Sequence, residues 1–563
     1  MNLLTEPWLP VRKRDGTREW IGPSRLSDPD VVAFDADRAD FNGALAQFAI
    51  GLLQTTTPVD SPMEWRRLFN NPPDAATLQN WFAPVMSAFE FDGDGARFMQ
   101  DGALENGGGK TQDIAGLLIE SPGNNALQNN SDHFVKRGVV DAVCDRCTAA
   151  ALFTLQTNAP EGGGGGGGKF TGIRGGGPLT TLVLCQPHRS LWQDLWLNVR
   201  EYSVFLNLPG DRSKSDLQAK FPWIGTLSLP IGDNRLITPV QVHPAHVFWA
   251  MPRRVRIEFT TARAGQCSVC QEYTPRVVRN YVDGTGGFYY KEKGLWDHPL
   301  SPYQEQERIG RQPVHQRDPI GYRHWLAWVA GTGQERQQPA KVVNWCVTAR
   351  HRELLGQLRL WAFGYNMDSA KPECWYESTV PLYGLAECEP DKQREVQSEV
   401  AHWIAAANLA SRQLAASVKA AWFSESATKK WKTDFAKGFS AGVTAQFWSR
   451  TEREFYNQLN QLIESVRSST PPEQLAVRES WLRHLSAAAI RLFDEEVVGC
   501  GLIERQNPKR IAAAFQRLKG SRDGVEGLFG SEMRQVLGLP NGGIAGAKAR
   551  KSNRRSAKHA AAT

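Results

Sequence analysis

The sequence Cys144-Asp-Arg-Cys147 and its later counterpart Cys267-Ser-Val-Cys270 decide most about this fold. Two Cys-x-x-Cys pairs supply four thiolates at the local spacing that suits one tetrahedral metal ion. Because Cys267 follows Cys147 by 120 positions, a shared zinc ion would staple two distant segments of one large domain. The alternative is four buried, reduced cysteines. Four thiolate ligands leave no open position for water, so the spacing predicts a structural zinc rather than a catalytic one.

A run of seven glycines lies between the two cysteine pairs. Lys169 follows it, and the glycine bias continues as far as Pro178. The run has neither the pattern of a phosphate loop nor a dinucleotide-binding fingerprint. Two interpretations stay open: a flexible linker, or bare backbone that approaches a phosphate or a groove edge, with Lys169 and Arg174 adding positive charge. The seven residues are Gly162, Gly163, Gly164, Gly165, Gly166, Gly167 and Gly168.

The composition is that of a soluble globular protein. Of 563 residues, 41% are hydrophobic and 22% are charged, and the 19 tryptophans favour large packed or stacking surfaces. There is no apolar stretch long enough for a membrane span and no signal-peptide pattern, so we expect a cytoplasmic protein with reduced cysteines.

The net charge is concentrated at the C-terminus. Without the six basic residues that follow Gly542, the formal charge of +7 falls to +1. Any nucleic-acid surface on the rest of the chain must therefore be a local patch. The Ala-, Lys- and Arg-rich tail, residues 541–563, is expected to be disordered; it either contacts a polyanion or serves only solubility.

The sequence pattern predicts a large α+β domain followed by a helical domain. Within residues 1–388, the segments 179–184 and 254–259 are typical of strands, and the segments 41–53, 149–156 and 339–363 are typical of helices. From residue 389 to residue 540, four amphipathic segments with mostly short connections predict a C-terminal four-helix bundle.

Basic residues alternate with aromatic ones around the second cysteine pair. Arg254 and Arg256 fall on one face of a predicted strand, and Arg279 and Lys291 lie near tyrosines. This pattern suits nucleic acid, although a solvated strand face would look the same. The segment His243-Pro-Ala-His246 has no third metal ligand nearby and is interpreted as a turn. No serine, cysteine or two-carboxylate catalytic set shows motif spacing.

In these motifs the chain resembles the CasA family, the large subunits of the type I-E CRISPR surveillance complex Cascade. The resemblance covers the chain up to the basic tail, and it depends on the order and spacing of several short motifs. Besides the cysteine pairs and the glycine segment through Gly177-Pro178, these are Asn2-Leu-Leu-Thr-Glu-Pro-Trp-Leu-Pro-Val11, Phe98-Met-Gln100, Met251-Pro-Arg-Arg254, Gly294-Leu-Trp-Asp-His-Pro299, Gly364-Tyr-Asn-Met-Asp368 and Trp375-Tyr-Glu-Ser-Thr379.

The resemblance implies a non-catalytic subunit that inspects duplex DNA for a short protospacer-adjacent motif, mainly from the minor groove. It also implies help in opening the duplex, assembly with crRNA-containing Cascade subunits, and support for recruiting a separate helicase-nuclease. Minor-groove readout is degenerate, and glycine favours a close approach to that groove. The alternatives are a zinc-dependent hydrolase of nucleic acids, which would need a His, Glu or Asp set with ligand spacing, and a stand-alone zinc-containing DNA-binding regulator.

The resemblance also assigns DNA-binding residues. The family's glycine loop corresponds to the run at residues 162–168. A mobile loop near the motif includes Phe134, for which an ordinary loop anchor is the alternative. The lysine that relatives place in the groove has no clean counterpart, so Lys291 and Arg279 are the candidates. The family's wedge hairpin corresponds to Met367, Asp368, Ser369, Ala370 and Lys371, with Met367 or Lys371 as the wedging side chain.

The glycine-loop assignment predicts that Gly166→Asp and Gly167→Asp each weaken binding of a duplex target by the guide-RNA complex. Added bulk and negative charge would oppose a close approach of the backbone to DNA. Titration of a labelled duplex measures the effect, and unchanged affinity in both variants would remove the assignment.

Overall fold

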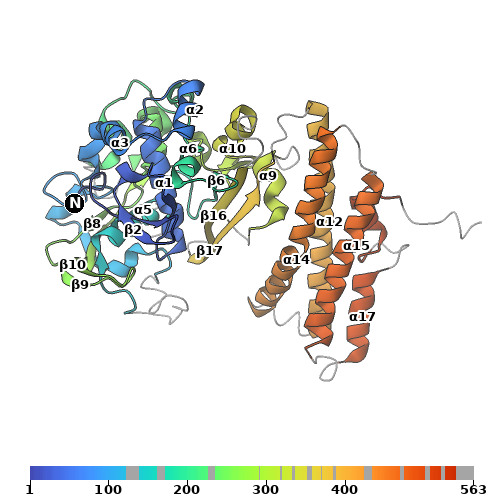
Figure 1. Cartoon of the computed structure of the whole chain (residues 1–563). Helices are drawn as coiled ribbons and strands as arrows, with labels where there is room; N and C mark the ends of the chain where they lie inside the picture. Colours follow the sequence, from blue (N-terminus) through green and yellow to red (C-terminus); the bar gives the residue numbers. More distant parts are fainter. Residues whose placement is uncertain are drawn as a thin grey trace, which may run out of the picture. The chain divides into compact units, whose positions relative to one another are not determined.

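The computed structural model describes residues 1–121, 138–160, 171–225, 235–290, 292–316, 320–331, 337–350, 358–368, 371–383, 389–423, 434–468, 474–500, 507–520 and 526–540 (Figure 1). The chain divides into two compact units. The first comprises Met1–Ile320 and Ala327–Gly384, and the second comprises Gly321–Leu326 and Leu385–Thr563. In the described ranges, no helix is both long and apolar enough to cross a membrane.

The first unit is a mixed α+β fold, as the sequence predicts. Its described strands form small sheets with the orders β2-β1-β3, β5-β10-β9, β4-β11-β8, β12-β7, β14-β13-β15 and β17-β16-β6. The strands are β1 (Leu9–Lys13), β2 (Arg18–Ile21), β3 (Val31–Phe34), β4 (Gly109–Asp113), β5 (Val143–Cys144), β6 (Thr180–Cys185), β7 (Arg235–Leu236), β8 (Val255–Ile257), β9 (Arg263–Gln266), β10 (Tyr273–Val278), β11 (Asn280–Gly284), β12 (Phe288–Tyr289), β13 (Tyr303–Gln306), β14 (Gly310–Pro313), β15 (Gln337–Gln338), β16 (Leu358–Asp368) and β17 (Lys371–Pro381).

Helices occur in both units. The α-helices before residue 350 are α1 (Ala39–Thr56), α2 (Pro62–Asn70), α3 (Ala75–Phe82), α5 (Asp145–Asn158), α6 (Leu191–Trp196), α7 (Tyr202–Phe205), α8 (Leu217–Lys220), α9 (Trp325–Val329) and α10 (Lys341–Trp345). Those of the second unit are α12 (Pro390–Trp422), α14 (Asp434–Arg467), α15 (Gln474–Phe493), α17 (Pro508–Lys519) and α18 (Ser531–Val536).

The core of the first unit is aromatic and is centred on helix α1. Phe48 of this helix meets five aromatic rings edge-on, at centroid distances of 5.0 to 5.9 Å. One of these rings, Phe153, belongs to α5, so α1 and α5 pack together through Phe48. Edge-to-face pairs add stability beyond the apolar area that they bury, which explains the many aromatic residues of this unit. The five rings are those of Trp8, Phe89, Phe98, Phe153 and Trp249.

A long hairpin is formed by β16 and β17, and one end of it pairs with β6. Residues Leu358 to Phe363 of β16 also pair with β6, whereas the rest of β16 pairs only with β17. The outer part of the hairpin is therefore a two-stranded ribbon. The sequence prediction of a helix over residues 339–363 is wrong for Leu358 to Phe363, which form strand rather than helix. Among the described residues of this range, α10 and the π-helical turn Cys346–Arg350 are helical.

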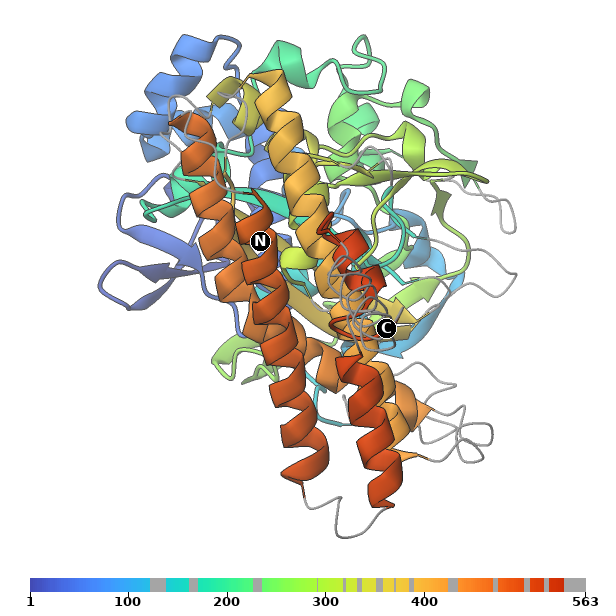
Figure 2. The ribbon, with the colours of Figure 1, turned by 90° about the vertical axis from the view of Figure 1, so that its right-hand side faces the viewer.

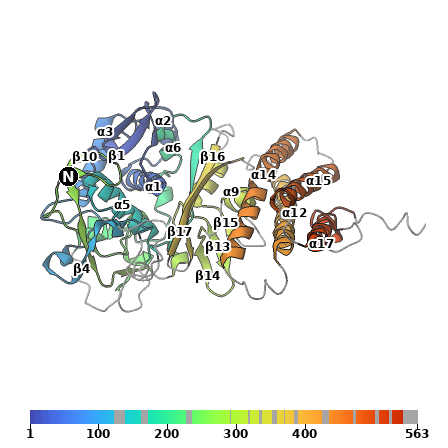
Figure 3. The same ribbon diagram turned by 90° about the horizontal axis from the view of Figure 1, so that it is seen from below.

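The second unit is helical in its described residues, and α12, α14, α15 and α17 correspond to the four amphipathic segments of the sequence (Figures 2 and 3). Trp481 of α15 donates its indole N–H to the backbone oxygen of Trp403 in α12 at 3.0 Å. Arg478 and Glu399 form a largely buried ion pair between the same two helices. Apolar stripes on these helices are buried, which accounts for their packing.

Two glycines inside helices provide a matched test of packing. A Cβ on Gly51 of α1 would lie 2.9 Å from the Cβ of Phe248, whereas a Cβ on Gly442 of α14 would meet nothing within 4 Å. Alanine favours a helix over glycine by about 1 kcal/mol, and overpacking costs about 1–3 kcal/mol. Gly51→Ala should therefore lower the free energy of unfolding, and Gly442→Ala should raise it. Urea unfolding measures both, and stabilisation by Gly51→Ala would contradict the packing of α1.

Candidate metal centre and nucleic-acid interface

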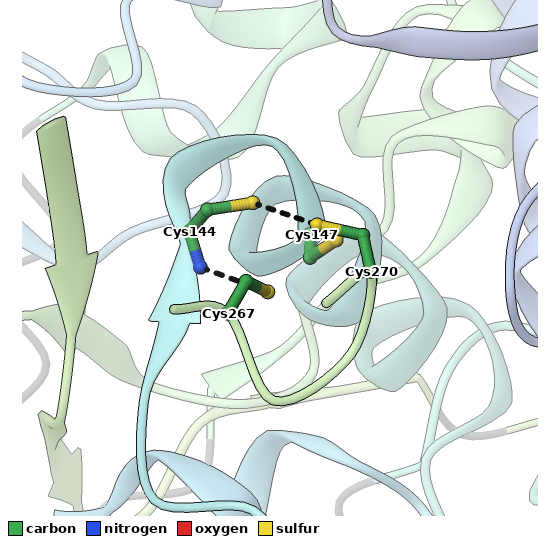
Figure 4. Close-up of side chains that lie close together, drawn as sticks. All are labelled: Cys144, Cys147, Cys267 and Cys270. Carbon is green, nitrogen blue, oxygen red and sulfur yellow. Dashed lines mark hydrogen bonds between the residues drawn. The ribbon is translucent and has the colours of Figure 1, made fainter. Parts of the chain in front are cut away.

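The four paired cysteines lie together, as the sequence predicts (Figure 4). Cys144 ends the short strand β5 and caps helix α5, and Cys147 lies in the first turn of that helix. Cys267 and Cys270 lie in the loop between β9 and β10. Strand pairing brings the two segments together, because Cys144 lies opposite Val277 in the antiparallel β5–β10 ladder.

The cysteine geometry suits a tetrahedral metal ion. All four Sγ atoms lie within 4.8 Å of one another, and those of Cys144 and Cys270 are 3.8 Å apart. Four sulfur ligands at about 2.3 Å from one zinc ion would be separated by about 3.8 Å. All four side chains are buried. The backbone N–H groups of Cys144 and Val269 donate to Cys267 Sγ at 3.3 and 3.4 Å, which stabilises a thiolate there.

The thiols also influence one another's protonation. Hydrogen bonds from the three other cysteines lower the pKa of Cys267 well below its usual value. Hydrogen bonds with Cys144, Cys267 and Cys270 raise the pKa of Cys147. A divalent cation would favour the thiolate at every position, and the donor set fits zinc best among common metals.

Polar contacts outside the thiols hold the two knuckles in place. The hydroxyl of Ser268 accepts from the backbone N–H groups of Asp141 and Ala142 at 3.3 Å and donates to the Asp141 carboxylate at 3.1 Å. Arg276 of β10 pairs with Asp145, the first residue of α5, at 2.6 Å. Burial raises the pKa of Asp145, and this ion pair opposes the rise. The segment around the second cysteine pair therefore contacts the start of α5 through an ion pair as well as through the cysteines.

Helix α5 connects the cysteine cluster to the glycine-rich segment. The helix has 14 residues, which corresponds to a length of about 21 Å. The glycine run follows its C-terminal end, and the segment then returns to the helix, because the N–H of Gly177 donates to the backbone oxygen of Asn158 at 3.3 Å. Most of residues 171–180 are buried. The described part of the glycine-rich segment is therefore packed structure and not a linker.

The glycine-rich segment contacts the predicted wedge hairpin. Gly177 has a φ of +57°, and a Cβ there would lie 2.6 Å from both Met367 Cγ and the backbone oxygen of Tyr365. A Cβ on Gly364 of the same hairpin would lie 2.7 Å from the backbone oxygen of Pro178. Both contacts require glycine, because any side chain would force the segment and the ribbon apart.

A buried polar cluster anchors the same part of the hairpin to helix α1. Tyr365 donates its hydroxyl to Asp40 Oδ2 at 2.6 Å, and Arg38 pairs with Asp40 at 3.0 Å. Arg38 also pairs with Glu120 at 3.0 Å. Burial opposes the charge of Arg38, yet the neighbouring carboxylate of Asp40 raises the pKa of its guanidinium overall. The cluster thereby fixes the ribbon two residues from Met367.

The structure describes only some of the predicted DNA-binding residues. Met367 is half-buried in β16, and the backbones of Asp368 and Lys371 pair opposite each other. Arg279 forms an exposed ion pair with Asp141 at 3.0 Å. Outside the described residues lie Phe134, Gly162, Gly163, Gly164, Gly165, Gly166, Gly167, Gly168, Lys169, Lys291, Ser369 and Ala370.

Three basic residues considered for nucleic acid are not available to it. Arg174 is buried and donates to Thr180 Oγ1 at 2.8 Å, and burial lowers the pKa of its guanidinium to about 10. Arg254 and Arg256 are also buried; Arg254 pairs with Asp101, and Arg256 pairs with Glu105 at 3.0 Å. The two interpretations of Arg254 and Arg256, as part of a DNA-binding face and as part of a solvated face, are therefore both wrong.

The histidine segment is a turn, as expected. His243 precedes a short 3-10 helix, Pro244–Phe248, and its Nδ1 accepts from the N–H of Ala245 at 3.0 Å. Burial lowers the pKa of His246 to about 4, and its Nε2 lies 3.1 Å from the hydroxyl of Tyr290. Both histidines are buried and form hydrogen bonds within the core of the first unit.

Sequence reasoning missed two cations that act on the glycine-rich segment. Lys293 Nζ donates to the backbone oxygen of Gly172 at 2.6 Å, and Arg253 Nη2 donates to that of Pro160 at 2.6 Å. The residues themselves carry no signal for this role. Arg253 lies within the motif at residues 251–254, and Lys293 directly precedes the motif at residues 294–299, but neither motif indicates a contact with the glycine-rich segment.

The chain thus has an α+β unit that contains the four-cysteine cluster and a second, helical unit. The chain matches the family of the CRISPR-associated protein Cse1 over residues 2–492, and it therefore belongs to that family.

Solved structures of low sequence identity share the fold. The structure of Thermus thermophilus CasA (Cse1) matches with a TM-score of 0.65 at 16% identity, covering 96% of this chain and 99% of that one. Cse1 from Acidimicrobium ferrooxidans matches with a TM-score of 0.63 at 18% identity, over 96% and 98%. A chain of a CRISPR RNA-guided surveillance complex matches with a TM-score of 0.60 at 16% identity, over 92% and 98%.

The cysteine geometry predicts about one zinc ion per purified chain. Cys270→Ser should lose the zinc and lower the free energy of unfolding on the order of 3–5 kcal/mol, because binding to a structural site contributes directly to folding. Cys346→Ser is the matched control, since Cys346 is also buried but lies outside the cluster. Elemental analysis and urea unfolding measure both effects. A metal-free native chain, or full zinc content in Cys270→Ser, would contradict the prediction.

Proposed function

We propose that this chain is the large, non-catalytic subunit of a crRNA-guided Cascade complex. It recognises the protospacer-adjacent motif in duplex DNA from the minor groove, helps to open the duplex for guide pairing, and supports recruitment of the helicase-nuclease. Family membership supports the assignment, and so does the likeness to a chain of a CRISPR RNA-guided surveillance complex. In such complexes guide pairing reads the long target, and protein reads only the short motif.

The observation that carries the proposal is the contact between the glycine-rich segment and the β16–β17 hairpin. A motif reader must couple two tasks: approaching a narrow groove with bare backbone, and inserting a wedge beside it. Here Gly177 lies directly against Met367, near the end of the described ribbon. Unstacking a base step costs a few kcal/mol, so a wedge needs rigid support. The Tyr365–Asp40 hydrogen bond and the Gly177 contact supply that support.

The remaining assignments follow from the same proposal. Residues 1–388 carry motif recognition, residues 389–540 form the family's four-helix bundle, and residues 541–563 are a basic tail. The cysteine cluster holds a structural zinc ion. A zinc-dependent hydrolase has less support, because four thiols make up the cluster and leave no position for a reacting water.

Gly177→Ala tests the proposal. A side chain at a φ of +57° is strained, and its Cβ would displace Met367 or the ribbon backbone. We expect about a tenfold loss of affinity for a duplex target, or about 1.4 kcal/mol, with normal binding of a single-stranded target. Gly16→Ala is the matched control, because Gly16 has a φ of +88° and open space around it.

Electrophoretic or fluorescence titration of the reconstituted complex measures both affinities. If Gly177→Ala binds the duplex as tightly as Gly16→Ala does, the contact with Met367 has no part in motif reading.

A further inference from the structure

The guanidinium group of Arg174 is buried where helix α1 and strand β6 meet. It donates from Nη1 to Thr180 Oγ1 at 2.8 Å and to Ser301 Oγ at 3.2 Å, and from Nη2 to Gln47 Oε1. All three acceptors are neutral. Burial lowers the pKa of Arg174 to about 10, which still leaves its guanidinium charged at neutral pH. The core of the first unit therefore contains a positive charge that its hydrogen-bond partners do not balance.

Other arginines with as little exposure have a carboxylate partner. Arg254 pairs with Asp101, and Arg256 pairs with Glu105 at 3.0 Å. Within the described part of the chain, no carboxylate pairs with Arg174. A buried cation without a counter-ion is strongly unfavourable, because it loses its hydration and gains no opposite charge in return. The fold therefore has a reason to bind an anion next to Arg174.

A small cavity lies beside this guanidinium. Its volume is about 20 Å³, whereas a water molecule needs a cavity of roughly 10–15 Å³. The cavity therefore has room for one occupant of about that size. Apolar and polar side chains share its wall, among them those of Phe153, Ile173, Phe248, Gln47, Arg174 and His298.

His298 supplies a second donor to the cavity. Its Nδ1 accepts from the backbone N–H of Leu300 at 3.2 Å. Burial lowers the pKa of His298 well below its usual value, and the charge of Arg174 lowers it further, so the imidazole is neutral. A neutral imidazole whose Nδ1 accepts carries its proton on Nε2. Neither this N–H nor the Nε–H of Arg174 has an acceptor among the residues that the structure describes.

We propose that this cavity binds one monatomic anion, such as chloride, between Arg174 and His298. The anion accepts hydrogen bonds from both side chains and compensates the charge of the guanidinium. A water molecule could accept the same hydrogen bonds, but it would leave the charge uncompensated. The bound ion stabilises the contacts of Arg174 with α1 and β6. This inference does not depend on the function proposed above.

The first test measures the thermal midpoint of the full chain while sodium chloride replaces sodium gluconate at constant ionic strength. Gluconate is too large for the cavity. Arg174→Gln removes the guanidinium charge. Arg254→Gln is the matched control, because it also removes a buried arginine, but one whose charge Asp101 already balances.

We expect the midpoint of the unaltered chain to rise by about 2 °C between about 10 and about 300 mM chloride, since a ligand that binds only the folded chain stabilises it. Arg174→Gln should show no such rise. Arg254→Gln should unfold at a lower temperature but keep the chloride dependence. An equal rise in the unaltered chain and in Arg174→Gln, or no rise in either, would overturn the inference.

A second measurement needs only the unaltered chain and so does not depend on whether Arg174→Gln folds. Crystals grown in sodium bromide should show an anomalous scattering peak in the cavity, within hydrogen-bonding distance of Arg174 and His298. A water molecule at that position, without anomalous signal, would rule out the anion site.

Discussion

The cluster of four cysteine thiols is the constraint on which the functional part of the structure depends. It joins two segments that are 120 positions apart, and it lies where the short β5–β10 ladder and the start of helix α5 meet. The two residue pairs of the ladder are supplemented by the contacts of Ser268 with Asp141 and of Arg276 with Asp145. A metal ion bound by four thiolates would strengthen this connection, and it would fix the direction of α5 because one knuckle is the first turn of that helix.

Beyond helix α5, close backbone contacts at glycines and one buried hydrogen bond position the glycine-rich segment and the β16–β17 ribbon. Helix α5 ends where the glycine-rich segment begins, and the segment then presses on the β16–β17 ribbon at Gly177 and Pro178. At the same place, Tyr365 ties the ribbon to Asp40 at the start of helix α1. Three parts of the chain, around residues 40, 177 and 365, are thus held in one arrangement by a glycine contact and one buried hydrogen bond. This arrangement supports the proposal that the chain presents backbone and a wedge to the same stretch of DNA.

Local patterns in the sequence predict local structure well here. The Cys-x-x-Cys spacing predicted the cluster, because each pair is a local signature of a metal knuckle even though the two pairs are distant in sequence. The apolar periodicity predicted α1, α5 and β6, because each of these elements depends on neighbours within a few residues. The segment 339–363 was misjudged since Leu358 to Phe363 become a strand by pairing with β6, a partner far away in sequence. The burial of Arg174 and Arg254 was missed for a related reason. Their distant partners, Ser301 for Arg174 and Asp101 for Arg254, reach them only in the fold.

The residue pattern alone left the glycine run, Arg279 and Lys291 as open nucleic-acid candidates, and the wedge hairpin and Phe134 were assigned only through the resemblance to a family. Glycine backbone has little chemical signature of its own for contact with DNA. The contact of Gly177 with Met367 supports the correspondence of these two motifs, since it joins segments that the resemblance had assigned separately.

The most direct test of the account compares the reconstituted guide-RNA complex with and without this chain. Two duplex targets would differ only in the three bases beside the guide-matched site. The account predicts that the chain strengthens binding to one target and not to the other. Equal binding of both targets, with or without the chain, would contradict its role as the motif reader.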